Sequence, residues 1–219
     1  MTMAAVQPGR AAGLPALVKS LLINLLGPYL VYRATAPSFP PNSPVPLLLC
    51  ALVPAVEFAI LFARRRVVDV IAIISFAQIA AGLVISLVAA SATASLDGHA
   101  MMPAILGLVF AASAAIGKPL MTPLARQTMA GDDPARQARF DSIALLPGAR
   151  RTFMHLTLAW AAALGLESAV LLAARRTLGN ADYLLVSQVI NYGVLAMLIW
   201  GSIHFGRRAM RNDPDWPAE

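Results

Sequence analysis

The chain of 219 residues is 58% hydrophobic and 13% charged, with a mean hydropathy of +0.69. Soluble domains contain about 45–50% apolar and about 25% charged residues, so this composition excludes a soluble globule, a disordered chain, a collagen and a coiled coil. The net charge of +6 does not indicate nucleic-acid binding, because the basic residues cluster at the ends of apolar runs.

Six apolar segments follow one another along the chain, and a membrane span needs about 20 mostly apolar residues. The segments are Ala16–Arg33, Pro46–Ala63, Val67–Ser91, Met102–Pro123, Thr152–Ala174 and Tyr183–Phe205. Pro28, Pro54 and Pro119 interrupt the first, second and fourth, although neighbouring helices in a bundle can satisfy the carbonyl groups that proline frees. We therefore expect an all-α, polytopic membrane protein with six transmembrane helices.

The six segments divide the chain into two halves of three helices each. The first half covers residues 16–91 and the second covers 102–206, with tails at 1–15 and 207–219. Short loops join most of the segments, and the exception is the connection 124–151 in the second half. We expect this connection and the two tails to be the main parts of the chain outside the membrane.

The connection 124–151 contains the signals of a short helix. Asp133 followed by Pro134 is typical of an N-cap and a first helical residue. The apolar residues that follow share one side of such a helix: Phe140, Ile143, Ala144 and Leu146. We predict a helix that lies on the membrane surface and is stopped by Pro147 and Gly148.

Lysine and arginine are distributed unevenly between the two sides that six spans create. Arg33, Arg175 and Arg176 fall on one side, and all the others of the 17 basic residues fall on the opposite side. Cytoplasmic loops carry an excess of Lys and Arg. We therefore predict that both tails and the connection 124–151 face the cytoplasm.

The two halves align when the chain is shifted by 110 residues. Residues 57–66 then lie over 167–176 with six identities in ten, and Gln78 lies over Gln188. The shift also superposes two ridges of small residues at every fourth position: Ala51, Ala55, Ala59 and Ala63 over Ala161, Gly165, Ala169 and Ala173. Small residues at this spacing let helices pack closely in lipid.

This alignment predicts an inverted repeat. Because each half holds three spans, the second half runs in the opposite sense to the first, which is a common plan for carriers. We expect the second and fifth helices to cross at the centre through the two ridges. The alternative is a chance alignment in a chain that is rich in Ala and Leu, since the first span does not align with the fourth.

Two carboxylates lie inside predicted spans, Glu57 in the second and Glu167 in the fifth. Such groups are costly in lipid and are usually turned inwards, paired or neutralised. Glu167 and Asn191 are equally far from the turn at Asn180, so a hydrogen bond between them is expected. For Glu57 the nearest candidate counter-ion is Lys19.

These intramembrane polar residues fit two interpretations. In the first, Glu57 and Glu167 are coupling groups of a proton or cation path, with Gln78, Gln188 and Asn191 near them. In the second, the same side chains are hydrogen-bond clasps between helices, each worth about 1 kcal/mol or less. The sequence leaves both interpretations open.

The sequence contains no signature of enzyme chemistry. It has no Gly-x-Ser-x-Gly, His-Glu-x-x-His, phosphate-binding loop, dinucleotide-binding glycine motif or Cys-x-x-Cys. His99, His155 and His204 lack the spacing of metal ligands. Packing or an interfacial belt is as good an interpretation as a substrate cage for the aromatic residues Trp160, Trp200, Tyr29, Tyr32, Tyr183 and Tyr192. We therefore expect no catalytic residue, no cofactor and no bound metal.

Several short sequence patterns occur between about Asn24 and Arg208. They are Asn24-x-x-x-Pro28-x-x-x-Tyr32, Gly117-Lys118-Pro119-Leu120, Phe140-Asp141, and Thr157-x-x-Trp160 followed by Glu167. Together they resemble a family of bacterial six-span inner-membrane proteins that often carry the label of intracellular septation protein A. The resemblance implies a multi-pass protein of the bacterial inner membrane, and it implies no catalytic residue.

Two functions follow as expectations. The first is a small carrier or channel-like protein for a solute or ion, with Glu57 and Glu167 as its coupling carboxylates. The second is a non-transporting scaffold of the envelope or the septum, in which these residues only clasp helices. The candidate partners are the lipid bilayer, a second copy of the chain, and envelope or division proteins, and no nucleic acid is expected.

Overall fold

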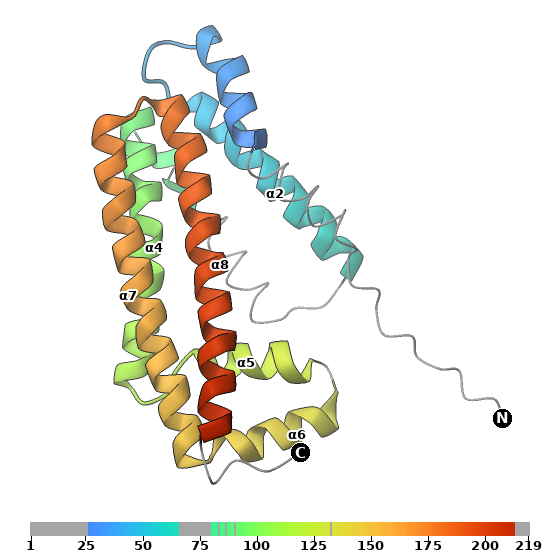
Figure 1. Ribbon diagram of the computed structural model, residues 1–219. Coiled ribbons are helices and arrows are strands. Elements are labelled where there is room, and N and C mark those ends of the chain that lie inside the picture. Colours follow the sequence, from blue (N-terminus) through green and yellow to red (C-terminus); the bar gives the residue numbers. More distant parts are fainter. Residues whose placement is uncertain are drawn as a thin grey trace, which may run out of the picture.

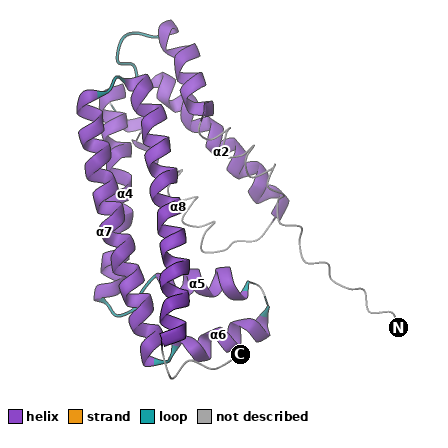
Figure 2. Cartoon of the chain, viewed as in Figure 1, coloured by secondary structure: helices purple, strands orange, loops and turns teal. Residues whose placement is uncertain are grey.

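The computed structural model describes residues 26–65, 80–82, 84–85, 87–89, 91–131 and 133–212. In these residues all regular secondary structure is helical (Figure 1; Figure 2). The elements are a helical stretch at 26–35, η1 (Ala36–Ser38), α2 (Val45–Arg65), α4 (Ala92–Ala115), α5 (Met121–Ala130), α6 (Pro134–Ala144), α7 (Pro147–Thr177) and α8 (Asn180–Asn212).

Several predicted features lie outside the described residues. These are Lys19, Gln78 and most of the segment Val67–Ser91, together with the side chains of Glu57 and Ala63 in α2. The first-half counterpart of α8 falls largely in this part of the chain, whereas α2 is the counterpart of α7. The inverted repeat therefore stays a prediction.

Three helices of the described part, α4, α7 and α8, are long and apolar enough to cross a membrane. They lie side by side in Figure 1, and α7 contacts both of the others. The 31 residues of α7 rise about 1.5 Å each, which is more than enough for the hydrocarbon thickness of about 30 Å. The chain is therefore an all-helical protein with the features of a membrane protein.

Helix α7 packs closely on α4 near Ala161, the first residue of its small-residue ridge. Gly107 of α4 is buried, and a Cβ atom there would lie 2.9 Å from the carbonyl oxygen of Ala161 and 3.3 Å from Cβ of Leu164. Close to this crossing, Ser168 donates a hydrogen bond of 2.7 Å to the carbonyl oxygen of Ala100. These contacts hold the two backbones close together, as small residues do in lipid.

This packing differs from the predicted crossing of the second and fifth helices. In Figure 1, α2 meets the bundle near its first turns and then diverges from it. Leu47 accordingly belongs to a buried cluster with residues of α4 and α7. The remaining ridge positions are half-buried at Ala51 and Ala55 and exposed at Ala59, Gly165, Ala169 and Ala173. In the described part of the chain, α7 makes its close contact through Ala161 and Leu164 on Gly107 of α4, and most of its ridge is exposed.

The boundaries of α4 also differ from the predicted span Met102–Pro123. The helix begins at Ala92 because the side chain of Ser91 accepts a hydrogen bond of 3.1 Å from the backbone N–H of Ala94. It ends at Ala115, before Gly117 adopts a φ of 73° that favours glycine. The stretch 92–101, expected as a loop, is therefore helical.

The connection between α4 and α7 forms two helices, α5 and α6, at one end of the bundle (Figure 1). The Asp133 cap is confirmed, since its Oδ1 accepts a 2.9 Å hydrogen bond from the backbone N–H of Ala135. Pro147 does not stop this helix. The helix ends at Ala144 and Pro147 begins α7, because proline suits the first helical position, where an N–H is not needed.

Two buried clusters hold the ends of the bundle. Towards α5 and α6 the cluster contains Phe110, Met121, Ala130, Phe140, Ala149, Phe153, Leu156 and Leu164. Towards the opposite end it contains Leu47, Ala92, Leu96, Ala100, Leu171 and Tyr183. The candidate functional site lies between these two clusters.

Candidate functional site

A cavity of about 410 Å³ lies between the described parts of α2, α4, α7 and α8. Its volume falls in the range of about 300–1,000 Å³ that is typical of small-molecule sites. Most of the wall is aliphatic, including Leu47, Leu96, Leu106, Leu164, Leu171, Leu184, Val194, Leu195 and Leu198. Its polar side chains include Ser95, His99, Glu167, Ser187, Gln188 and Asn191. The cavity is therefore apolar overall, with polar groups contributed by α4, α7 and α8.

Glu167 of α7 is the carboxylate of this wall, and it is only 5% exposed. The amide of Asn191 can be oriented so that its nitrogen faces hydrogen-bond acceptors. In this orientation the nitrogen donates to Oε1 of Glu167 at 2.7 Å. The same nitrogen donates to the carbonyl oxygen of Ser187 at 3.2 Å. The contact between Glu167 and Asn191 that the sequence predicted is thus present. None of the ion pairs among the described residues includes Glu167.

One face of α8 supplies the polar stripe opposite Glu167. Ser187, Gln188 and Asn191 lie within a little more than one turn of that helix and all line the cavity. The hydroxyl of Ser187 donates to the carbonyl oxygen of Leu184 at 3.1 Å. Of the predicted coupling residues, the structure therefore brings Glu167, Gln188 and Asn191 together at one site.

On the α4 side of the cavity the polar groups are Ser95 and His99. Nδ1 of His99 lies 2.8 Å from the carbonyl oxygen of Ser95. The opposite ring nitrogen, Nε2, would lie 3.1 Å from a Cβ atom on Gly82, so this glycine leaves room for the ring. The sequence analysis missed His99 as a wall residue because it placed the first ten residues of α4 in a loop.

Two aromatic residues of the wall belong to α7 and α8. Trp160 stacks on Phe110 with ring centroids 5.5 Å apart, and its indole N–H donates to Oγ of Ser202 at 2.9 Å. Tyr183 is buried and lines the same cavity. Both residues are packed against neighbours and also line the cavity. A role in packing and a role in the cavity wall are therefore compatible.

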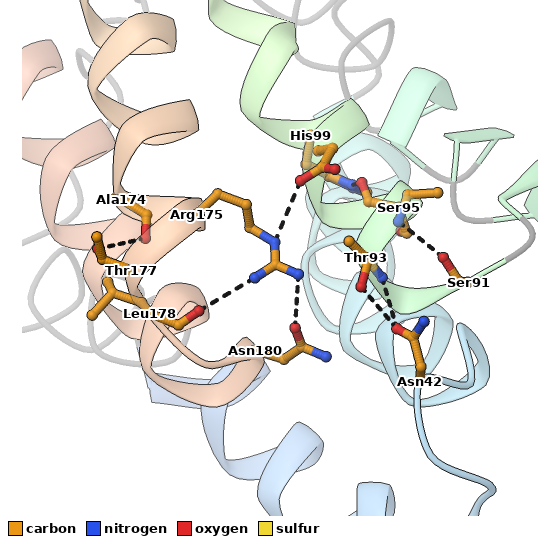
Figure 3. Close-up of polar contacts among 12 residues, drawn as sticks. Asn42, Ser91, Thr93, Ser95, His99, Ala174, Arg175, Thr177, Leu178 and Asn180 are labelled. Atoms are coloured by element: carbon orange, nitrogen blue, oxygen red, sulfur yellow. Dashed lines mark hydrogen bonds and ion pairs between the residues drawn. The ribbon is translucent and has the colours of Figure 1, made fainter.

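Arg175 forms a polar cluster at the end of the bundle next to Tyr183 (Figure 3). Its guanidinium donates to the carbonyl oxygen of Leu178 at 3.3 Å and to Oδ1 of Asn180 at 3.0 Å. The guanidinium also pairs with Asp97 of α4 at 3.5 Å and lies over the ring of Tyr183, 5.6 Å from its centroid. This cluster ties the ends of α4, α7 and α8 together beside the cavity.

The cluster extends to the N-terminal part of the described chain, where the amide of Asn180 donates to the hydroxyl of Tyr32 at 3.1 Å. In the sequence, Arg175 served only to decide which side of the membrane each loop faces. The six predicted spans put Asp97 and Asn180 on the same side as Arg175, and this shared side could have suggested the cluster. The pairing could not be seen while Asp97 was assigned to a loop.

Residues of the short sequence patterns lie at junctions between segments. Cys50 of α2 donates to the carbonyl oxygen of Pro28 at 3.1 Å. The hydroxyl of Thr157 accepts from the backbone N–H of Met121, which begins α5, at 3.3 Å. Asp141 accepts two hydrogen bonds of 2.7 and 3.0 Å from Arg126. The patterns therefore mark places where one segment is fixed to another.

A comparison of the chain with protein families, curated proteins and solved structures finds no match. Among the described residues, no group of three or more His, Cys, Asp and Glu side chains could hold a metal ion. The described residues of the site offer one carboxylate, hydrogen-bonding groups on one helix face and an apolar wall. Such a site can bind a small molecule or hold and release a proton.

Proposed function

We propose that the protein is a small carrier or channel-like protein of the bacterial inner membrane, and that Glu167 is a coupling carboxylate in its pathway. The observation that carries this proposal is the cavity of about 410 Å³ with Glu167 in its wall. A buried carboxylate in lipid is costly, and Asn191 offsets only part of that cost. A proton or a bound cation can compensate the remaining charge.

The coupling follows from the chemistry of one carboxylate. A protonated Glu167 is neutral and holds no cation strongly, whereas the ionised form attracts a cation in the low dielectric of the cavity. Proton and cation therefore compete for the same oxygen atoms. The Asn191 amide can donate to Oε1 in either state, so it holds the side chain in the wall while the charge changes.

The proposed topology has six spans in two inverted halves, with Glu57 as the counterpart of Glu167 and with both termini in the cytoplasm. Its assignment of the C-terminal tail and of the connection 124–151 to the cytoplasm is supported by the distribution of arginine over the bundle. Arg150 and Arg151 lie at the beginning of α7, and Arg207 and Arg208 near the end of α8, which are at the same end in Figure 1. Because the cytoplasmic side carries the excess of basic residues, this end is assigned to the cytoplasm.

A non-transporting envelope scaffold is the second candidate. It is favoured by hydrogen bonds that join α4, α7 and α8 in the described part, among them those from Ser168 to Ala100, from Trp160 to Ser202, and from Asn191 to Glu167. Hydrogen bonds of this kind stabilise helix packing in lipid. In this alternative the polar residues of the cavity wall fix the bundle and no solute passes.

The experiment that separates the two candidates uses the variant Glu167→Gln in reconstituted vesicles. The glutamine keeps a carbonyl oxygen for Asn191 and removes the titratable charge. We would impose a pH gradient, trap the dye pyranine inside, and offer Na⁺, K⁺ and tetraphenylphosphonium in turn. A carrier predicts flux for wild type and a loss of at least about tenfold for the variant, with unchanged abundance and melting temperature.

The matched control is Ser168→Ala, which removes a neighbouring interhelical hydrogen bond on the α4 side and leaves the cavity wall unchanged. We expect it to lower the melting temperature slightly and to leave the flux per folded protein unchanged. Wild-type vesicles that show no flux for any of the three cations contradict the carrier proposal. Equal flux for wild type and Glu167→Gln contradicts the role of this carboxylate.

A further inference from the structure

We infer that the ligand of this cavity is a lipophilic organic cation, a molecule with one positive charge and an apolar body. This inference deepens the proposed function and rests on it, because it names the class of substrate for the same site. It follows from three properties of the wall: its charge, its apolar surface and its aromatic residues.

The charge of the described wall disfavours an anion. Among the described residues that line the cavity, Glu167 is the carboxylate and none is Lys or Arg. Arg175 lies beside Tyr183 but is engaged with Asp97, Asn180 and the carbonyl oxygen of Leu178. An anion in this cavity would lose its hydration without a cationic partner, and that cost is large in an apolar environment. A cation finds its counter-ion in Glu167.

The apolar surface of the wall selects the body of the cation. Ca²⁺ takes six to eight oxygen ligands and Mg²⁺ keeps several waters, whereas the described residues of this wall offer one carboxylate beside a few hydroxyl and amide groups. A sugar or an amino acid would leave polar groups unpaired against leucine side chains. An apolar body gains free energy from the same surface, about 25 cal/mol for each Å² removed from water.

The aromatic residues favour a charge that is diffuse. Trp160 and Tyr183 both line the cavity, and aromatic rings attract organic cations through the negative potential of their faces. Arg175 already lies over the ring of Tyr183, 5.6 Å from its centroid, so the ring left for a ligand is that of Trp160, which stacks on Phe110. A phosphonium or ammonium ion with aryl or alkyl groups matches all three properties.

The test is a binding measurement on the full chain in detergent. Tetraphenylphosphonium and tetraphenylborate have the same shape and opposite charge, so their difference isolates the sign of the charge. We expect saturable binding of the phosphonium in equilibrium dialysis, and binding of the borate that is at least about tenfold weaker. Glu167→Gln should weaken phosphonium binding at least about tenfold. Equal affinity for the two ions, no saturable phosphonium binding, or an unchanged affinity in the variant overturns the inference.

A second pair of variants keeps the test independent of Glu167. Val194→Phe adds volume to the cavity wall, whereas Val189→Phe makes the same change on an exposed position of the same helix that does not line the cavity. We expect Val194→Phe to weaken phosphonium binding at least about fivefold and Val189→Phe to leave it within twofold. Equal effects of the two substitutions overturn the inference.

The failure of this inference can be told from the failure of the proposed function. Saturable phosphonium binding without flux in vesicles contradicts the carrier proposal and supports the assignment of the ligand class. Proton-coupled flux of Na⁺ or K⁺ that depends on Glu167, without phosphonium binding, supports the carrier and overturns the ligand class.

Discussion

Helix α7 has two faces that differ in how they meet their neighbours. Towards α4 the contact is close, because Gly107 brings the two backbones together and Ser168 bonds to the carbonyl oxygen of Ala100. Towards α8 the contacts are polar and flank a cavity, with Asn191 bonded to Glu167 and Trp160 bonded to Ser202. Less of α8 than of α4 or α7 is buried. One helix thus provides a tight packing surface on one side and the wall of a binding site on the other.

The largest effect is expected when the tight surface is broken by Gly107→Leu. Its Cβ atom alone would lie 2.9 Å from the carbonyl oxygen of Ala161, so the two helices must separate. Overpacking of this kind lowers the free energy of unfolding by about 1–3 kcal/mol or more. Thermal unfolding in detergent measures it, with Gly193→Leu on α8 as the control, since nothing lies within 4 Å of a Cβ atom there. Similar melting temperatures for the two variants would refute the tight packing of α4 on α7.

The next effect concerns the cluster that ties both sides together at one end of the bundle. Arg175→Met leaves Asp97 and Asn180 without their partner, and hydrogen bonds to charged groups contribute about 1.5–3 kcal/mol each. We expect a loss of about 2 kcal/mol in the free energy of unfolding. Arg176→Met is the matched control, because Arg176 is exposed and should change stability by less than about 0.5 kcal/mol. Equal losses would show that the cluster contributes nothing specific.

The smallest effect is expected on the cavity side of α7. A double-mutant cycle of Glu167→Leu and Asn191→Leu measures the interaction between the two side chains, because each substitution removes it. Interhelical hydrogen bonds in lipid average about 0.6 kcal/mol, so we expect a coupling energy well below the effect of Gly107→Leu. A coupling energy above about 2 kcal/mol would favour the scaffold alternative, because the pair would then be a main support of the bundle.

The parts of the fold that the sequence predicts are those with strong local signals. The apolar runs locate α2, α7 and α8, and Asp133 with Pro134 marks the start of α6. The contact between Glu167 and Asn191 follows from counting residues on either side of a tight turn. Each of these inferences needs only the geometry of one helix or one hairpin.

The parts that the sequence misses depend on neighbours that hydropathy does not identify. The first turns of α4 contain Ser95, Asp97 and His99, which read as a polar loop until the partner Arg175 and the cavity are known. The ridge of α7 was expected to cross α2, whereas Gly165, Ala169 and Ala173 are exposed and α7 meets Gly107 of α4 through Ala161 and Leu164. Proline is common both just after the end of a helix and at its first position. The sequence therefore does not show which of the two Pro147 marks.

The central claim is that water and solutes reach the cavity beside Glu167. It is tested most directly by single cysteines on α8 in a Cys50→Ser background, treated in membranes with a charged thiosulfonate reagent. Ser187 lines the cavity and is replaced in Ser187→Cys. Val189 is 56% exposed in the isolated chain, on a surface that we assign to lipid, and is replaced in Val189→Cys. We predict that the cysteine at 187 reacts, that tetraphenylphosphonium slows its reaction, and that the cysteine at 189 stays unmodified. A cysteine at 187 that does not react with the reagent, together with a cysteine at 189 that does, would contradict the account.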